Sequence, residues 1–185
     1  MRGYISAVVL LSAVLAVSAE TVTFAAKPDA KLVQQVQADA KLLRESVYKP
    51  PDDVDAVLKI THPITIEEAG GEEKARQNAT SEARKQVTKL FTIEKVEFPE
   101  PPQFFAGKEH EFVFVPIKMT LLRADKIRDV STTFYLGGRK KGDAGFVYAD
   151  GAKLTLEKNV KTFFADYPED VEFPQVFRQQ IRPDR

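Results

Sequence analysis

The pattern of apolar residues changes once along this chain, at Thr92. Before that residue, from Asp29 onwards, apolar side chains recur three or four positions apart, as on one face of a helix. From Thr92 to Ala149, β-branched and aromatic residues alternate with polar ones, as in strands with one buried face. Helices that precede the strands, instead of alternating with them, are typical of an α+β domain with an antiparallel sheet. We therefore expect an α+β fold.

Proline and glycine divide the helical half. Pro50-Pro51 ends a first helix, and His62-Pro63 ends a short second one. A third region extends from Ile64 to Phe91, and Gly70-Gly71 should split it, since each glycine costs a helix about 1 kcal/mol. The inward stripe expected after this break consists of Ala75, Ala79, Ala83, Val87 and Leu90.

The expected sheet is an antiparallel meander. Its strands are predicted over residues 92–98, 112–122, 127–136 and 146–149, before a last helix over 154–165. Pro116 cannot donate a backbone hydrogen bond, so its strand should lie at an edge of the sheet or carry a bulge. We expect the sheet to curve strongly over the first helix and form a cone with a cavity at its open end.

Residues 1–19 have the features of a signal peptide. Arg2 supplies a short positive start, an apolar run follows to Val17, and Val17-Ser18-Ala19 places small residues before a cleavage site. The run is short for a bilayer span, which takes about 20 residues, so an uncleaved anchor is only the alternative. We predict cleavage after Ala19, a linker over residues 20–28, a single α+β domain over 29–174 and a flexible tail over 175–185.

Composition limits the partners and the chemistry. The chain has no cysteine, so disulfides, thiolate ligands and a lipid anchor are impossible. With the signal peptide, this favours export to a bacterial envelope, as a periplasmic or secreted protein with no stable membrane insertion after cleavage. The 27 basic and 27 acidic residues cancel, so we expect no nucleic-acid partner.

Several short features are similar to those of exported NTF2-like domains, which have a cystatin-like cone. They are Thr61-His62-Pro63, Gly70-Gly71, Val115-Pro116 and the segment Phe146-Val147-Tyr148-Ala149-Asp150-Gly151. The resemblance covers the pattern from Leu32 to Pro174, with Phe146 where such domains often have tryptophan. It implies the cone fold but no particular activity, because such cones serve as isomerases, dehydratases, binding modules and structural units.

The motifs of metal, phosphate and nucleophile chemistry are missing. The two histidines, His62 and His110, have no second ligand at helical spacing, so we expect no metal and no cofactor. The glycine-rich loop from Gly137 to Gly142 is not followed by the Ser/Thr-led helix of a phosphate loop. The chain also has no G-x-S-x-G elbow.

A proton-transfer site could still form inside a cone. It needs a histidine or carboxylate near a tyrosine, with a pKa shifted by burial. The candidate pocket residues are Tyr48, His62, Tyr135 and Tyr148. Packing explains the same residues, since buried tyrosines contribute rings to a core, and a histidine beside a helix end commonly caps it.

Two classes of function follow. The first is an exported, non-catalytic module that binds a small apolar ligand or a partner protein, through the cone or the sheet face, possible partners including a second copy. The phenylalanines favour it, because we expect some of them to be exposed and exposed aromatic patches usually mark contacts. The main ones are Phe104-Phe105, Phe163-Phe164, Phe173 and Phe177. The alternative is a cone enzyme of the isomerase or dehydratase type. Since the known catalytic motifs are missing, we favour binding.

Overall fold

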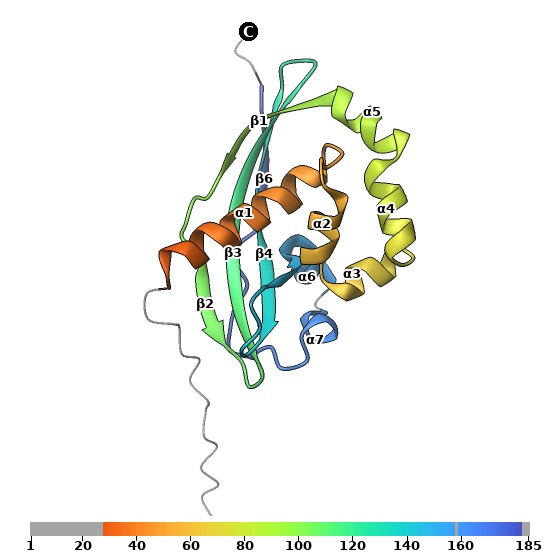
Figure 1. Ribbon diagram of the computed structural model, residues 1–185. Coiled ribbons are helices and arrows are strands. Elements are labelled where there is room, and N and C mark those ends of the chain that lie inside the picture. Colours follow the sequence, from red (N-terminus) through yellow and green to blue (C-terminus); the bar gives the residue numbers. More distant parts are fainter. Residues whose placement is uncertain (1–27, 158, 183–185) are drawn as a thin grey trace, which may run out of the picture.

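The computed structural model describes residues 28–157 and 159–182 (Figure 1). The predicted signal peptide, its cleavage site and most of the linker lie outside these residues. The described chain has an α+β fold, in which the helices of the first half come before a six-stranded antiparallel sheet. Among the described residues, no helix is long and apolar enough to cross a membrane.

Polar side chains mark where the first three helices begin. Asp29 caps α1 (Ala30–Ser46) by accepting a hydrogen bond from the Lys31 amide. Asp53 caps α2 (Val54–Ile60) in the same way. His62 was expected to end the second helix, but α2 ends at Ile60 and His62 caps the start of α3 (Pro63–Glu68).

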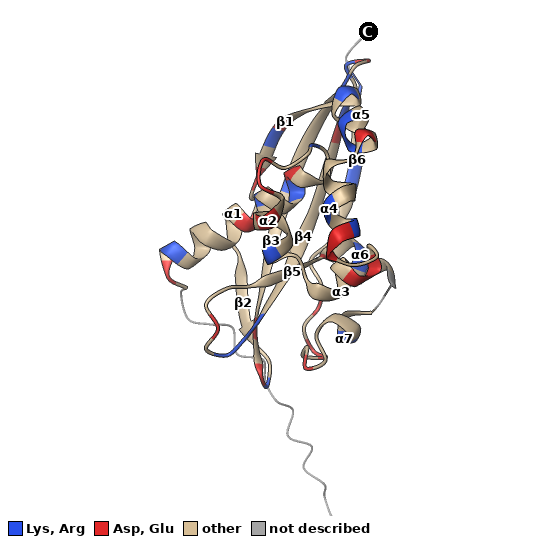
Figure 2. Cartoon of the chain, turned by 45° about the vertical axis from the view of Figure 1, so that its right-hand side comes forward, with Lys and Arg blue, Asp and Glu red and all other residues tan. Residues whose placement is uncertain are grey.

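The next two helices, α4 (Glu72–Thr80) and α5 (Glu82–Leu90), follow the predicted break at Gly70-Gly71. The inward stripe predicted for them is only partly confirmed: Ala75, Ala79 and Val87 are half-buried, but neither helix has a buried residue, and Leu90 is 59% exposed. Figure 1 shows the physical reason: α3, α4 and α5 form an arc at one side of the molecule instead of lying on the sheet. Lysine, arginine, aspartate and glutamate are interspersed along this arc (Figure 2).

Two long strands form the centre of the sheet, and each has two shorter neighbours on its outer side. On one side of β3, β1 and β2 pair with different parts of it, and on the other side of β4, β5 and β6 do the same. The strand bounds are β1 Phe91–Glu97, β2 Gln103–Ala106, β3 His110–Arg123, β4 Arg128–Lys140, β5 Val147–Asp150 and β6 Phe177–Ile181.

Pro116 lies in the central strand β3, not at an edge of the sheet as one expectation had it. On the β4 side it is opposite Phe134. On its other side, β3 pairs with β2 up to Phe114 and with β1 from Lys118 onwards. Neither β1 nor β2 therefore pairs with Pro116. The break between β1 and β2 thus accommodates the missing amide donor.

The C-terminal segment also differs from the expectation. Residues 177–181, placed in a flexible tail, form β6, which pairs antiparallel with residues 128–132 of β4. Its sequence, Phe-Arg-Gln-Gln-Ile, has no apolar alternation, and all its residues are exposed. The strand is therefore defined by its partner, a long-range interaction that local pattern does not reveal.

The sheet has a packed core on each face. The helices α1 and α2 cover one face over Val113, Val115 and Ile117, as the alternation along β3 predicted. The other face carries Phe112 and Phe114 beneath α6 (Gly151–Glu157), α7 (Val160–Phe163) and the segment that follows α7. A Cβ atom added at Gly138 would collide with the Phe164 ring on this second face.

The expected strong curvature is wrong: the sheet is open and only weakly curled (Figure 1). Two packed faces explain this, because a sheet with helices and aromatic side chains on both sides is held from closing over one of them. The same packing corrects the expectation of exposed aromatic contacts. Phe177 is 53% exposed, but the other residues proposed for contact are buried or half-buried: Phe104, Phe105, Phe163, Phe164 and Phe173.

Candidate functional site

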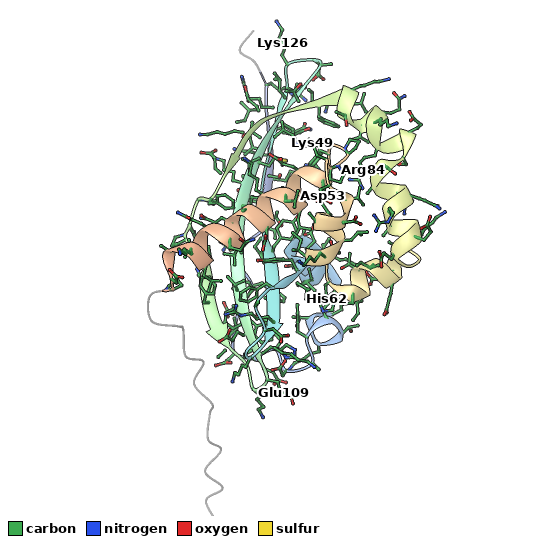
Figure 3. All side chains as sticks on the ribbon, viewed as in Figure 1. Lys49, Asp53, His62, Arg84, Glu109 and Lys126 are labelled. Carbon is green, nitrogen blue, oxygen red and sulfur yellow. The ribbon has the colours of Figure 1, made fainter. Side chains whose placement is uncertain are left out.

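His62, a predicted pocket residue, lies at the junction between α2 and α3 (Figure 3). Its Nδ1 accepts a hydrogen bond from the Ile64 amide at 3.2 Å, and its ring packs against Phe163 and Phe164 at centroid distances of 5.1 and 4.8 Å. Burial lowers its pKa, which favours the neutral form of the imidazole. These contacts are those of a capping and packing residue.

Tyr148, the second candidate, lies in the core on the α1 face. Its hydroxyl donates to Asp39 Oδ2 on α1, at 3.1 Å. Burial raises the pKa of both groups. The His62 backbone pairs with Tyr148, but the His62 ring packs with the aromatic side chains of the opposite face. The structure therefore does not join these two side chains in one pocket.

The other two candidates, Tyr48 and Tyr135, lie around one side chain that the sequence did not single out, Arg44. The guanidinium carbon of Arg44 is 5.3 Å from the centre of the Tyr48 ring, and its Nη2 is 3.4 Å from the Tyr48 hydroxyl. Tyr135 is buried beside it, and burial together with the charge of Asp150 raises its pKa, while the charge of Arg44 and a hydrogen bond with Arg44 act in the opposite direction.

Arg44 is the least expected residue of this group, because a guanidinium stays charged in proteins and is rarely buried without a partner. It lies in the last turn of α1, is 9% exposed, and donates from Nη2 to Ser131 Oγ on β4 at 2.7 Å. Its Nε is buried without a hydrogen-bond partner. Over residues 28–157 and 159–182, no carboxylate forms an ion pair with it.

A cavity of about 240 Å³ opens beside Arg44, and we call it the Arg44 pocket. It lies at a notch in the sheet: β6 pairs with β4 up to Thr132, and β5 begins to pair at Tyr135. Thr133 falls in this notch and its Oγ1 is a second buried polar atom without a partner. The residues that line the pocket are Arg44, Tyr48, Leu121, Asp129, Ser131, Thr132, Thr133, Ala152, Val176, Phe177 and Arg178.

The Arg44 pocket carries charges of both signs. Two arginines, Arg44 and Arg178, and one acid, Asp129, line it, so the lining has a formal net charge of +1. Asp129 is 5% exposed, and its Oδ1 accepts a hydrogen bond from Gln180 of β6 at 2.9 Å. Besides the two guanidinium groups, the lining has four side chains with hydroxyl groups that can donate hydrogen bonds: Tyr48, Ser131, Thr132 and Thr133. This set of groups can bind an anion.

A second cavity, of about 380 Å³, lies between the turn after β1 and the segment before β6. Pro116, Phe173 and Phe177 form apolar parts of its wall, and Glu100 and Glu172 add acidic groups. Among the described residues of its wall, Thr133 is the one with a buried polar atom that lacks a hydrogen-bond partner, and Thr133 also lines the Arg44 pocket. We therefore consider the Arg44 pocket the better candidate site.

The sequence pattern held a weak signal for Arg44. It follows the buried Leu43 and lies one helical turn after the buried Ala40, so it belongs to the edge of the α1 stripe that faces the sheet. The described residues contain no group of three or more His, Cys, Asp or Glu side chains that could hold a metal ion.

Comparison of the chain with models of protein families, with curated proteins and with solved structures finds no match. The resemblance to NTF2-like domains therefore stays a prediction. The function has to be argued from the residues of the site.

Proposed function

We propose that this protein is a non-catalytic binding module whose ligand occupies the Arg44 pocket. The observation that carries the proposal is the pair of buried polar atoms without partners, Arg44 Nε and Thr133 Oγ1, in the wall of one cavity. Buried polar groups are nearly always hydrogen-bonded, so a purely structural role leaves both atoms unexplained. A site that awaits a ligand accounts for them.

The lining also supports a ligand with an apolar part. Leu121, Val176 and Phe177 contribute apolar side chains, and the last two are 43% and 53% exposed at the rim. Apolar walls with a few polar groups are the usual composition of a small-molecule site. We propose, in line with the predicted signal peptide, that the module acts after export. A partner protein, including a second copy, is the other ligand class, and exposed β6 is the surface available to it.

The enzyme alternative has one observation in its favour, the contact between Asp39 and Tyr148. A carboxyl group with a raised pKa beside a tyrosine is a form that proton-transfer sites take. However, neither residue lines the two cavities described above. Since a substrate must reach the groups that exchange protons with it, the binding proposal has the stronger support.

NMR spectroscopy can test the proposal. We expect small apolar compounds from a fragment set to shift the backbone amide signals of residues 131–133 and 176–178 more than those elsewhere. Val176→Trp should weaken this binding by narrowing the rim of the pocket. Leu156→Trp is the matched control, because Leu156 is 84% exposed on α6 and does not line the pocket. Shifts confined to other surfaces, or none, would overturn the proposal.

A further inference from the structure

We infer that the ligand of the Arg44 pocket is a small monocarboxylate with an apolar body. This inference rests on the proposed function and specifies the chemical class of the ligand. The carboxylate would take the place of the missing counter-ion of Arg44, and the apolar body would lie toward Leu121 and Phe177. Each part of this assignment comes from a different feature of the pocket.

The need for an anion follows from the burial of Arg44. A buried guanidinium normally pairs with a carboxylate, since burying an unpaired charge is costly, yet no carboxylate among the described residues forms an ion pair with Arg44. The planar guanidinium group matches a carboxylate in geometry and can bind it through two parallel hydrogen bonds. Ser131 and the Tyr48 ring already hold the guanidinium of Arg44 in place, so a ligand would find it oriented.

Capping of α1 does not explain Arg44, because another arginine performs that task. Figure 3 shows Arg84 reaching from α5 toward the end of α1. Its Nη1 donates to the carbonyl oxygens of Ser46 and Val47, which are among the free acceptors at the C-terminus of a helix. Arg44 therefore remains available for another function.

The net charge of the pocket lining favours a ligand with a single negative charge. Two arginines and one aspartate give the pocket a net charge of +1, which one carboxylate neutralises. A phosphate dianion would carry its second charge into a pocket that already holds the buried acid Asp129. The size agrees with a small ligand, since about 240 Å³ is below the roughly 300–1,000 Å³ of most ligand pockets.

The test compares acids with uncharged compounds of the same shape. Hexanoate with hexanamide, and benzoate with benzamide, are titrated into the protein and followed by calorimetry and by amide NMR. We expect both acids to bind about ten- to hundredfold more tightly than their amides, the range given by a charge-assisted hydrogen bond. Inorganic phosphate should bind more weakly than either acid.

Variants test whether Arg44 causes the preference for acids over amides. Arg44→Gln should remove the preference for acid over amide, whereas Arg128→Gln should preserve it. Arg128 is a suitable control because it is exposed, pairs with Glu94 and does not line the pocket. Comparison of acid with amide on the unaltered protein gives an answer even if Arg44→Gln does not fold.

The outcomes separate this inference from the proposed function. Equal binding of acid and amide, with shifts in the pocket, would overturn the inference and leave the binding proposal in place. Tighter binding of phosphate than of the acids would overturn the assignment of a single charge. Failure of both acids and both amides to bind would overturn the inference and the binding proposal together.

Discussion

Two buried polar side chains, His62 and Arg44, differ in how their burial is compensated. Histidine can lose its proton, and the neutral ring of His62 accepts a hydrogen bond from Ile64 and is hydrogen-bonded to the Phe163 backbone. Arginine keeps its charge, so Arg44 depends on Ser131, on Tyr48 and Tyr135 and, in our proposal, on a ligand. The first residue is satisfied within the fold, and the second is not.

His62 should make stability depend on pH. Because burial lowers its pKa in the folded protein, the unfolded chain takes up a proton first as the pH falls below about 6.5. The free energy of unfolding should therefore decrease from about pH 7 to pH 5. In His62→Asn, which retains a side-chain cap, this decrease should be smaller. Urea titrations at several pH values measure it, and an unchanged pH dependence in the variant would contradict the assignment.

Core residues on the two faces of the sheet should contribute about equally to the free energy of unfolding. Phe114 and Val115 are 1% and 0% exposed and belong to different cores. Truncation of either to alanine should lower the free energy of unfolding by about 2–5 kcal/mol, since it leaves a cavity. Lys118→Ala, on the same strand but partly exposed, should cost less than about 0.5 kcal/mol. Chemical denaturation measures all three, and an unchanged stability in a core variant would contradict that face of the core.

At the scale of elements, α4 and α5 are only weakly attached to the core. Neither helix has a buried residue, and their connections are polar. Arg84 joins α5 to the end of α1, and Arg76 joins α4 to Asp55 of α2. Local stability in proteins follows such differences in packing.

Hydrogen exchange should reveal this difference. Amides of α4 and α5 should exchange before those of β3 and β4, and Arg84→Ala should increase exchange in α5 and in the last turn of α1. Lys85→Ala is the matched control, because the ion pair of Lys85 is with Glu82 of the same helix and does not reach α1. Equal protection of α5 in the two variants would show that Arg84 does not anchor it.

These elements also show what sequence can predict. The first helix and the strand around Val115 follow from periodicity, which is a local property. In contrast, β2 is a short strand in a hairpin with the start of β3, and the prolines before β2 concealed it. The strand β6 is also short and pairs with distant residues of β4. Tyr48 and Tyr135 lie beside Arg44, which the sequence analysis missed because a charged residue at the edge of a helix stripe is usually exposed.

At the scale of the whole molecule, β6 connects the C-terminal segment to the candidate site. The chain passes from the core of one face, at Phe173, to the edge of β4, where Arg178 and Phe177 line the Arg44 pocket. Gln180 holds Asp129 through a hydrogen bond. The pocket is therefore complete only when the last strand is paired.

A chain that ends at Pro174 should accordingly lose both stability and binding. We expect the free energy of unfolding to fall by about 1–3 kcal/mol, because Val130 and Asp129 lose their cover and the β4 edge loses its partner. Hexanoate should no longer bind more tightly than hexanamide. A chain that ends at Ile181 is the matched control, since it retains β6, and it should match the full protein in both respects. Calorimetry and urea unfolding measure the two properties. If the chain ending at Pro174 were as stable and bound hexanoate as well, β6 would not be part of the site, and the tail would behave as the sequence pattern predicted.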